Sequence, residues 1–250
     1  VPDVQVYYRG IDPTPIREFV MKDWNDITSF GGAVCLPGDV VFGAGGGVLF
    51  IPSHLVADVV EGIKSCGDVK FSVKMRLGWD NTDDAADVVR LLNGVELQHI
   101  TLHPRTGIQQ YKGEVDADAF ARIYSLSDNA VIYNGDISSV EDMHNLEAQF
   151  PNLKGFMLGR GLLGCPSLAV EYGKGEVWST EKRIALMLAM HTELMDEYSK
   201  ILKGDTQMLN KMRTFWEYAE ALLTRKPYKK VMKSGNLKNY LAAVAELKRL

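Results

Sequence analysis

Residues 71–103 hold three segments in a row: Phe71-Ser-Val-Lys-Met-Arg76, a helix-like stretch at Asp83–Leu92, and His99-Ile-Thr-Leu-His103. The first and last are short, apolar and rich in β-branched residues, as strands are, and the middle one is long enough for a helix. Two neighbouring parallel strands need such a crossover, because the chain has to return to the edge of the sheet at which it started. These residues therefore predict a parallel α/β fold.

The same alternation extends to both sides of this unit. Further strand-like runs lie at Val4–Tyr8, Ala33–Leu36, Ala130–Tyr133 and Gly155–Leu158. Further helix-like stretches lie at Ser53–Ser65, Ala117–Leu126 and Ser139–Gln149. Ser139 stands where an N-cap belongs, and Asp142 follows three residues later, which is close to the capping-box pattern.

Four successive strands end in charged residues or in turns. These ends are Lys74 with Arg76, His103 with Arg105, Asn134-Gly135-Asp136, and Gly159-Arg160-Gly161. Ligands bind at the carboxyl ends of strands in parallel α/β folds, so we expect one shared active-site rim there. The last two ends are glycine turns, which let backbone N–H groups approach an anion, and together they predict a phosphate site.

Two side chains allow a functional and a structural interpretation. Lys74 lies in an otherwise apolar strand, where it either forms an ion pair within the fold or faces an electron-rich ring such as a flavin. Cys35 lies in a glycine-rich region that we expect to be a loop, from Gly31 to Gly47. It is either a small buried hydrophobic residue or a reactive thiol.

The chain changes character near Trp178. From there on, apolar residues recur with helical spacing around 184–201, 208–222 and 237–247. We therefore expect an α/β domain over 1–177 and a helical domain over 178–250. The helical part has 14 Lys/Arg and 8 Asp/Glu, a formal charge of +6, whereas residues 1–177 have 14 and 24, a charge of −10. The basic part is either a surface for a polyanion or a solvated helical face.

The composition excludes several classes of protein. With 250 residues, 46% of them hydrophobic and 24% charged, the chain is neither disordered nor collagen-like. Its three cysteines stand at long spacings, which suggests neither a disulfide framework nor a metal site, and a reducing cytoplasm is the expected location. No apolar stretch is long enough for a membrane helix and no signal peptide is visible. The start at Val1 indicates a trimmed product or a fragment.

Four blocks, taken together, resemble the tRNA-dihydrouridine synthase family in order and spacing. They are Ser-Val-Lys-Met-Arg-Leu-Gly-Trp-Asp (72–80), Ile-Thr-Leu-His-Pro-Arg-Thr-Gly-Ile-Gln-Gln-Tyr-Lys-Gly (100–113), Tyr-Asn-Gly-Asp-Ile (133–137) and Met-Leu-Gly-Arg-Gly-Leu-Leu-Gly-Cys-Pro (157–166). The segment Lys211-Met-Arg-Thr-Phe-Trp216 is similar to part of the C-terminal domain of that family.

The resemblance implies an FMN-containing (β/α)8 barrel of the TIM type, followed by a small helical domain that binds tRNA. The family reduces the C5–C6 double bond of selected uridines in tRNA, with NADPH as the source of electrons. A closed barrel has eight strands, and about six are visible here, so we expect the first two strands to be missing from this chain. We also expect a monomer.

The same resemblance assigns roles to individual residues. The positions that match flavin contacts are Gln5, Lys74, His103, Asn134, Gly135, Asp136, Gly159 and Arg160. Cys35 matches the proton donor to C5 of the base. The ring carbonyls of uracil need hydrogen bonds from cationic groups, for which His103, Arg105 and Lys112 are candidates.

A base that is to be reduced has to leave its stack, so the rest of the tRNA has to be held elsewhere. We assign this task to phosphate contacts from the basic residues of the C-terminal part. They are Arg225, Lys226, Lys229, Lys230 and Lys233.

Two other functions stay open. An FMN barrel acting on a small molecule would use the same flavin residues without a basic tail. A non-catalytic tRNA-binding homologue would account for the segment around Cys35, which reads Ala33-Val34-Cys35-Leu36-Pro37 where the family has Asn-x-Gly-Cys-Pro.

Overall fold

The computed structural model describes residues 28–30, 33–35, 40–44, 47–51 and 55–250. Their contacts form two compact units, which we describe separately. The sheet unit contains the described residues of Met21–Asp136 together with His144–Leu158. The helical unit contains Ile137–Met143 and Gly159–Leu250.

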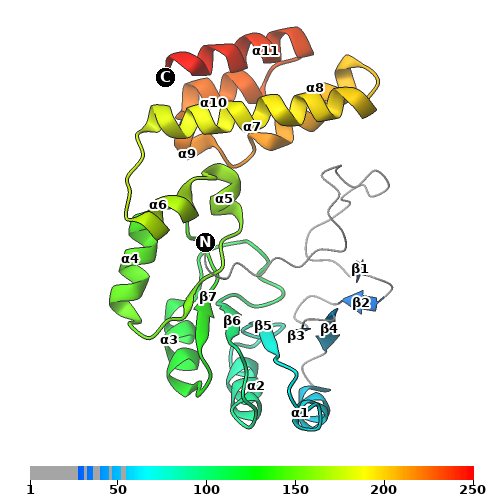
Figure 1. Ribbon diagram of the computed structural model, residues 1–250, viewed down its shortest axis with the longest axis vertical. Helices are drawn as coiled ribbons and strands as arrows, with labels where there is room; N and C mark the ends of the chain where they lie inside the picture. The colour runs from blue at the N-terminus through cyan, green and yellow to red at the C-terminus, as the bar shows by residue number, and fades with distance from the viewer. Residues whose placement is uncertain (1–27, 31–32, 36–39, 45–46, 52–54) are drawn as a thin grey trace. The chain divides into compact units, whose positions relative to one another are not determined.

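A six-stranded sheet forms the centre of the sheet unit (Figure 1). Its strands, in spatial order, are β4 (Gly47–Ile51), β3 (Val40–Ala44), β5 (Ser72–Arg76), β6 (Ile100–His103), β7 (Val131–Tyr133) and β8 (Gly155–Phe156). The strands from β5 to β8 are parallel, whereas β3 is antiparallel to both of its neighbours. The parallel α/β prediction is confirmed, and the arrangement is part of a (β/α)8 fold.

The helices α2 (Asp84–Leu92), α3 (Ala117–Leu126) and α4 (Val140–Gln149) connect the parallel strands, and α1 (Val56–Lys64) lies in the chain between β4 and β5. Along this row α1 contacts α2, and α2 contacts α3 (Figure 1). All four consecutive residues of β6 are buried, and successive side chains of a strand point to opposite faces, so both faces of this part of the sheet are covered. This is why these strands read as apolar runs.

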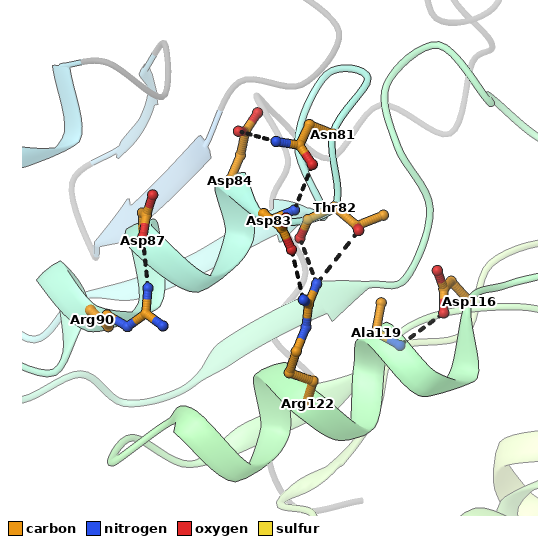
Figure 2. Close-up of polar contacts among 9 residues, drawn as sticks. All are labelled: Asn81, Thr82, Asp83, Asp84, Asp87, Arg90, Asp116, Ala119 and Arg122. Carbon is orange, nitrogen blue, oxygen red and sulfur yellow. Dashed lines mark hydrogen bonds and ion pairs between the residues drawn. The ribbon is translucent and has the colours of Figure 1, made fainter.

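Local hydrogen bonds fix where the helices begin. The Asp116 carboxylate accepts from the Ala119 backbone N–H at 2.8 Å and caps α3 (Figure 2). In the helical unit, Asp142 accepts from the Ser139 N–H at 2.8 Å, and the Ser139 hydroxyl accepts from the Asp142 N–H at 3.0 Å. The predicted capping pattern at Ser139 is confirmed.

The structure corrects the prediction for the segment before α1. Ala33–Leu36 is not part of the parallel series, because β2 (Ala33–Cys35) pairs antiparallel with β1 (Thr28–Phe30) in a separate two-stranded sheet. Only two residues separate these strands, which is too short for a parallel crossover. The expected glycine-rich loop is also wrong in part, because β2 and β3 lie within it and β3 pairs antiparallel with β4. The predicted strand at Val4–Tyr8 lies outside the described residues.

The helical unit consists of short helices packed around one long one (Figure 1). They are α5 (Arg160–Gly164), α6 (Leu168–Lys174), α7 (Thr180–Ile201), α8 (Asp205–Phe215), α9 (Glu220–Leu223), α10 (Arg225–Met232), α11 (Leu237–Glu246) and the 3-10 helix η2 (Leu247–Arg249). The core shared by the last six, from α7 to η2, is built on the fully buried Trp216 and Tyr240. Among the described residues, no helix is long and apolar enough to cross a membrane.

Two sequence predictions need refinement here. The helical period expected over Met208–Leu222 is divided between α8 and α9, because the chain turns between them and buries both Trp216 and Ala219. The boundary between residues 177 and 178 stays a prediction, since contacts within this unit run across it. For example, Glu171 of α6 binds the Arg183 guanidinium of α7 at 2.6 Å.

Candidate functional site

The register of the sheet brings the predicted residues of three strands to the same edge. Arg76 of β5 is opposite His103 of β6, and Lys74 is opposite Thr101. Leu102 is opposite Tyr133 of β7, so Asn134, the first residue after β7, lies at the level of His103. The carboxyl ends of parallel strands therefore place Lys74, His103 and Asn134 on one side of the sheet unit, as ligand-binding α/β folds require.

Lys74 carries the most perturbed charge of this edge. Burial, and secondarily the positive charge of Arg76, lower the pKa of its ammonium to about 8. No described residue accepts a hydrogen bond from it or forms an ion pair with it. The ion-pair interpretation is therefore not supported within the described part of the chain. A buried cation without an anionic protein partner is suited to a ligand that brings the negative charge.

The segment from Pro104 to Asp116 follows β6 as a closed loop, which we call the 104–116 loop. The Asp116 N–H donates to the Pro104 carbonyl at 2.8 Å and closes its base. The Gln109 side-chain amide donates to the carbonyls of Lys112 and Glu114 at 3.0 and 2.7 Å. These bonds give the loop one defined conformation before any ligand binds.

Arg76 fastens the 104–116 loop to the neighbouring strand. Its guanidinium donates to the carbonyls of Thr106 and Gln110, at 2.9 and 3.2 Å. It also lies 5.7 Å from the centre of the Tyr111 ring. Gln110 adopts a left-handed backbone conformation with φ 55°, which costs free energy for a residue with a side chain. The two carbonyl contacts hold that turn in place.

Arg105 lies inside the protein rather than facing an open substrate site. It is only 1% exposed, and it donates to both carboxylate oxygens of Asp136, at 3.0 and 2.5 Å, and to the Gly113 carbonyl at 2.7 Å. Its Nε is buried without a hydrogen-bond partner in the described structure. Sequence reasoning assigned Arg105 directly to the substrate, whereas the structure uses its guanidinium to join the 104–116 loop to the turn after β7.

The turn Asn134-Gly135-Asp136 is tightly packed. The Asn134 side-chain amide donates to the Met157 carbonyl at 2.8 Å, which links the ends of β7 and β8. A Cβ atom at Gly135 would lie 2.9 Å from Val115, so only glycine fits under the loop at this position. Asp136 has a φ of 43°, and the bidentate contact with Arg105 holds this strained residue.

The second glycine turn lies in the helical unit. Gly159 precedes the short helix α5, which begins at Arg160. A Cβ at Gly159 would meet no atom within 4 Å, whereas one at Gly161 would collide with the Ile137 carbonyl. Gly161 is therefore required by packing, and Gly159 leaves its backbone open. The phosphate site predicted from both turns stays a prediction, because the turns belong to different units.

Of the three cysteines, Cys35 is the last residue of β2, and its side chain lies outside the described atoms. Cys66 is exposed after α1, and Cys165 is partly buried near the Ser167 hydroxyl. Gln5 lies outside the described residues. Among the described residues, no group of three His, Cys, Asp or Glu is placed to hold a metal ion.

All five predicted basic residues of the C-terminal part are exposed and belong to one helix face. They are Arg225, Lys226, Lys229, Lys230 and Lys233, on or directly after α10. At about 100° per residue they lie within an arc of roughly 140°, opposite the buried Val231. Lys230 differs from the others, because it forms an ion pair with Glu246 at 2.6 Å. We call these five residues the α10 ridge.

Sequence reasoning missed the aromatic residues at this edge. Trp79 and Tyr111 are large and about half exposed, and both lie in the loops that follow β5 and β6. The signal was present in the sequence, because each stands beyond a strand end and close to a glycine, in Leu-Gly-Trp-Asp and Thr-Gly-Ile-Gln-Gln-Tyr.

Comparison with known proteins gives a consistent match. A family model described as Dihydrouridine synthase (Dus) matches residues 37–249. The chain is 33% identical over 127 residues to a tRNA-dihydrouridine(16) synthase of Pseudomonas syringae pv. tomato, covering 50% of this chain and 40% of the relative. It is 30% identical over 175 residues to a probable tRNA-dihydrouridine synthase of Rickettsia bellii, covering 66% and 53%. The chain thus spans about half the length of these relatives, or less.

Proposed function

Because this chain belongs to the dihydrouridine synthase family, we propose that it serves the flavin-dependent reduction of uridine to 5,6-dihydrouridine in tRNA. In this proposal FMN is the cofactor, NADPH the reductant and tRNA the partner of a monomeric, cytoplasmic protein. The observation that carries it is the edge at the ends of β5, β6 and β7. There the buried Lys74, which has no acceptor among the described residues, lies on the strand next to the one that carries His103.

The residues of this edge fit a flavin. The Lys74 ammonium, which finds no anion among the described side chains, would neutralise negative charge on the ring system. His103 lies two residues beyond the level of Lys74, opposite Arg76, and Asn134 follows β7 at the level of His103. Gly159 and Arg160, which belong to the helical unit, remain the predicted phosphate-binding residues. When bound and reduced, the flavin supplies a hydride to C6 of the uracil ring.

The remaining chemistry belongs to the side chains of this chain. With a pKa of about 8, Lys74 stays mainly protonated at pH 7 and keeps the charge that the proposal needs. Negative charge develops at C5 as C6 gains the hydride, and the Cys35 thiol would donate a proton there, since a thiol is mostly protonated at this pH. His103 and the exposed Lys112 would donate to the ring carbonyls, while Arg105 holds the loop that carries Lys112.

The α10 ridge would bind the tRNA backbone. Four of its five charges have no ion-pair partner among the described residues, so they are available to phosphates. Extruding a base from its stack costs a few kcal/mol, and electrostatic contacts at a distance from the reaction can supply that free energy.

The test uses the purified 250-residue chain. The absorbance spectrum and an FMN titration report flavin binding, a filter assay reports tRNA binding, and mass spectrometry of digested tRNA reports dihydrouridine after incubation with NADPH. We expect all three signals. Flavin without tRNA binding would favour an oxidoreductase for small molecules. Flavin and tRNA binding without dihydrouridine would favour a non-catalytic homologue. The absence of both would contradict the proposal.

A further inference from the structure

Three large apolar side chains are exposed at the edge that carries the proposed site. Trp79 is 49% exposed, Tyr111 43% and Ile108 54%. They come from two loops that are joined by backbone hydrogen bonds. The Gly107 N–H donates to the Gly78 carbonyl at 2.8 Å, and the Ile108 N–H donates to the Trp79 carbonyl at 2.9 Å. We call these three side chains the aromatic rim.

The aromatic rim is held in place by contacts within the sheet unit. A Cβ at Gly107 would lie 2.5 Å from Cε3 of the Trp79 indole, so one side of the indole rests on the Gly107 backbone. The Tyr111 ring has the Arg76 guanidinium 5.7 Å from its centre. Because these rings are already held, a ligand that covers them loses little conformational entropy in ordering them.

The loop that follows Trp79 is anchored as well (Figure 2). Arg122 of α3 forms an ion pair with Asp83 at 2.6 Å, and the Asn81 carboxamide oxygen accepts from the Asp83 N–H at 3.0 Å. The segment 77–84 is therefore fixed both at the Gly107 side and at the start of α2. A large apolar side chain that is exposed and held in place indicates an interaction surface, and a tryptophan can form one by stacking.

The charges beside the aromatic rim decide which part of a nucleic acid it contacts. Asp80 directly follows Trp79 and is exposed, and Asp84 is the first residue of α2. Carboxylates repel phosphates, so the sugar-phosphate backbone is disfavoured on this side. The face of a base is uncharged, and aromatic side chains bind it by stacking, with a favourable contribution from a nearby guanidinium such as Arg76.

We propose that the aromatic rim stacks the nucleotide that neighbours the extruded uridine. This rests on the proposed function. When one base leaves a stacked loop, its neighbours lose a stacking partner, and an aromatic surface next to the site restores it. The rim lies in the loops after β5 and β6, which carry Lys74 and His103. The occupant is therefore an unpaired nucleotide of the same tRNA, held by its base.

The test compares variants of the full chain for binding of an unmodified tRNA transcript at several salt concentrations. Trp79→Ala should weaken binding about tenfold or more, the usual effect of losing one stacked base, with an unchanged salt slope because no phosphate contact is lost. Trp79→Phe should retain most of the affinity. Gly107→Ala keeps the indole but displaces it, and should weaken binding in the same way. Val69→Ala, at an equally exposed apolar residue before β5, should match the parent.

The outcomes separate this inference from the proposed function. If the parent binds tRNA and Trp79→Ala binds it equally well, the rim is not a stacking surface, while the proposed function stands. A reduced salt slope in Trp79→Ala would also overturn it, by indicating a phosphate contact. A parent that is dimeric and a Trp79→Ala variant that is monomeric would assign the rim to a second copy of the chain. A parent without tRNA affinity would overturn both proposals.

Discussion

At the scale of single residues, two buried cations at one edge of the sheet have opposite surroundings. Arg105 is bonded to Asp136 and Gly113, whereas Lys74 has no acceptor among the described residues. The Arg105 guanidinium makes a structural contact between two loops. Burying the Lys74 ammonium without an acceptor in the described structure costs folding free energy and serves no structural role there, and such unfavourable arrangements are concentrated at functional sites. The sequence predicted that both residues matter, but it could not separate these roles, because the partner of Arg105 lies 31 residues further along the chain.

Lys74→Met should stabilise the protein and weaken flavin binding at the same time. The pKa of Lys74 is lowered from 10.5 to about 8, so the charged form disfavours the folded state. The resulting loss of folding free energy grows as pH falls from about 10.5 to 8 and is constant at lower pH. Removing the amine should raise the free energy of unfolding at pH 7 by about 1–3 kcal/mol. Urea denaturation and an FMN titration measure the two effects.

Lys64→Met is the matched control for Lys74. It removes an exposed lysine of the same unit, paired with Glu61 on α1, and should change neither quantity appreciably. A Lys74→Met variant that is destabilised, or that binds FMN like the parent, would remove the functional interpretation of this lysine.

Arg105→Met should destabilise the sheet unit by about 3 kcal/mol, because it removes the buried guanidinium that donates to the Asp136 carboxylate and to the Gly113 carbonyl. Arg122→Met breaks an ion pair of similar length, with Asp83, that is exposed on both sides (Figure 2). Its effect should stay below about 1 kcal/mol. Urea unfolding of both variants makes the comparison. Equal effects would show that Arg105 contributes no more than a surface ion pair.

At the scale of elements, the sequence predicted helices and strands best where the local capping residues and the pattern of buried residues agree. Ala117–Leu126 is a helix with the predicted bounds, since Asp116 caps it and Phe120 and Ile123 fill one face. The segment before residue 52 was predicted least well. Its short apolar runs pair antiparallel with neighbours only two residues away, and glycine-rich spacing alone does not distinguish such hairpins from a loop. The helix α10 was missed too, because half of its residues are charged and its apolar residues are too few to show a helical period.

Neutralising Lys226 and Lys229 on α10 should weaken tRNA binding and reduce the slope of log affinity against log salt by about two. The control is the double variant Lys230→Gln with Glu246→Gln, which removes the ion pair at 2.6 Å without changing the net charge. It should bind like the parent. Filter binding at four salt concentrations gives both slopes. A parental slope in the Lys226 and Lys229 variant would leave the ridge as a solvated helix face.

At the scale of the whole molecule, the family and the fold class followed from motifs that lie beyond four strand ends, because parallel topology brings those ends to one edge. The hydrogen-bond partners of the buried polar side chains could not be predicted from the sequence. In the helical unit, His191 of α7 and Trp216, which follows α8, both bind the hydroxyl of Tyr240 on α11, at 2.7 and 2.9 Å. These residues are separated by up to 49 positions, and helical periodicity identifies them as core without indicating that they share one hydrogen-bond network.

This network should make the chain sensitive to mild acid. Burial lowers the pKa of His191 to about 4, whereas an unfolded histidine titrates near 6.5. Below about pH 6.5 the unfolded chain therefore binds a proton that the folded chain excludes. Stability should fall by about 3 kcal/mol between pH 6.5 and pH 4, and stay nearly constant above pH 7. Glu171, whose pKa is lowered to about 2 chiefly by hydrogen bonds from Arg183, adds a further loss only below about pH 4.5.

Urea denaturation followed by tryptophan fluorescence tests this, since Trp216 lies in the network. His191→Gln can still hydrogen-bond the Tyr240 hydroxyl but does not titrate, so its stability should fall much less than that of the parent between pH 6.5 and 4.5. The residual fall comes from His99, whose pKa is also lowered by burial, and Glu171 does not yet contribute in this range. His144→Gln changes an exposed histidine paired only weakly with Glu147, at 3.4 Å, and should keep the parental pH dependence. If His191→Gln loses stability in acid as steeply as the parent, the proton is taken up elsewhere. The buried histidine would then be a packing residue without influence on the acid stability of the helical unit.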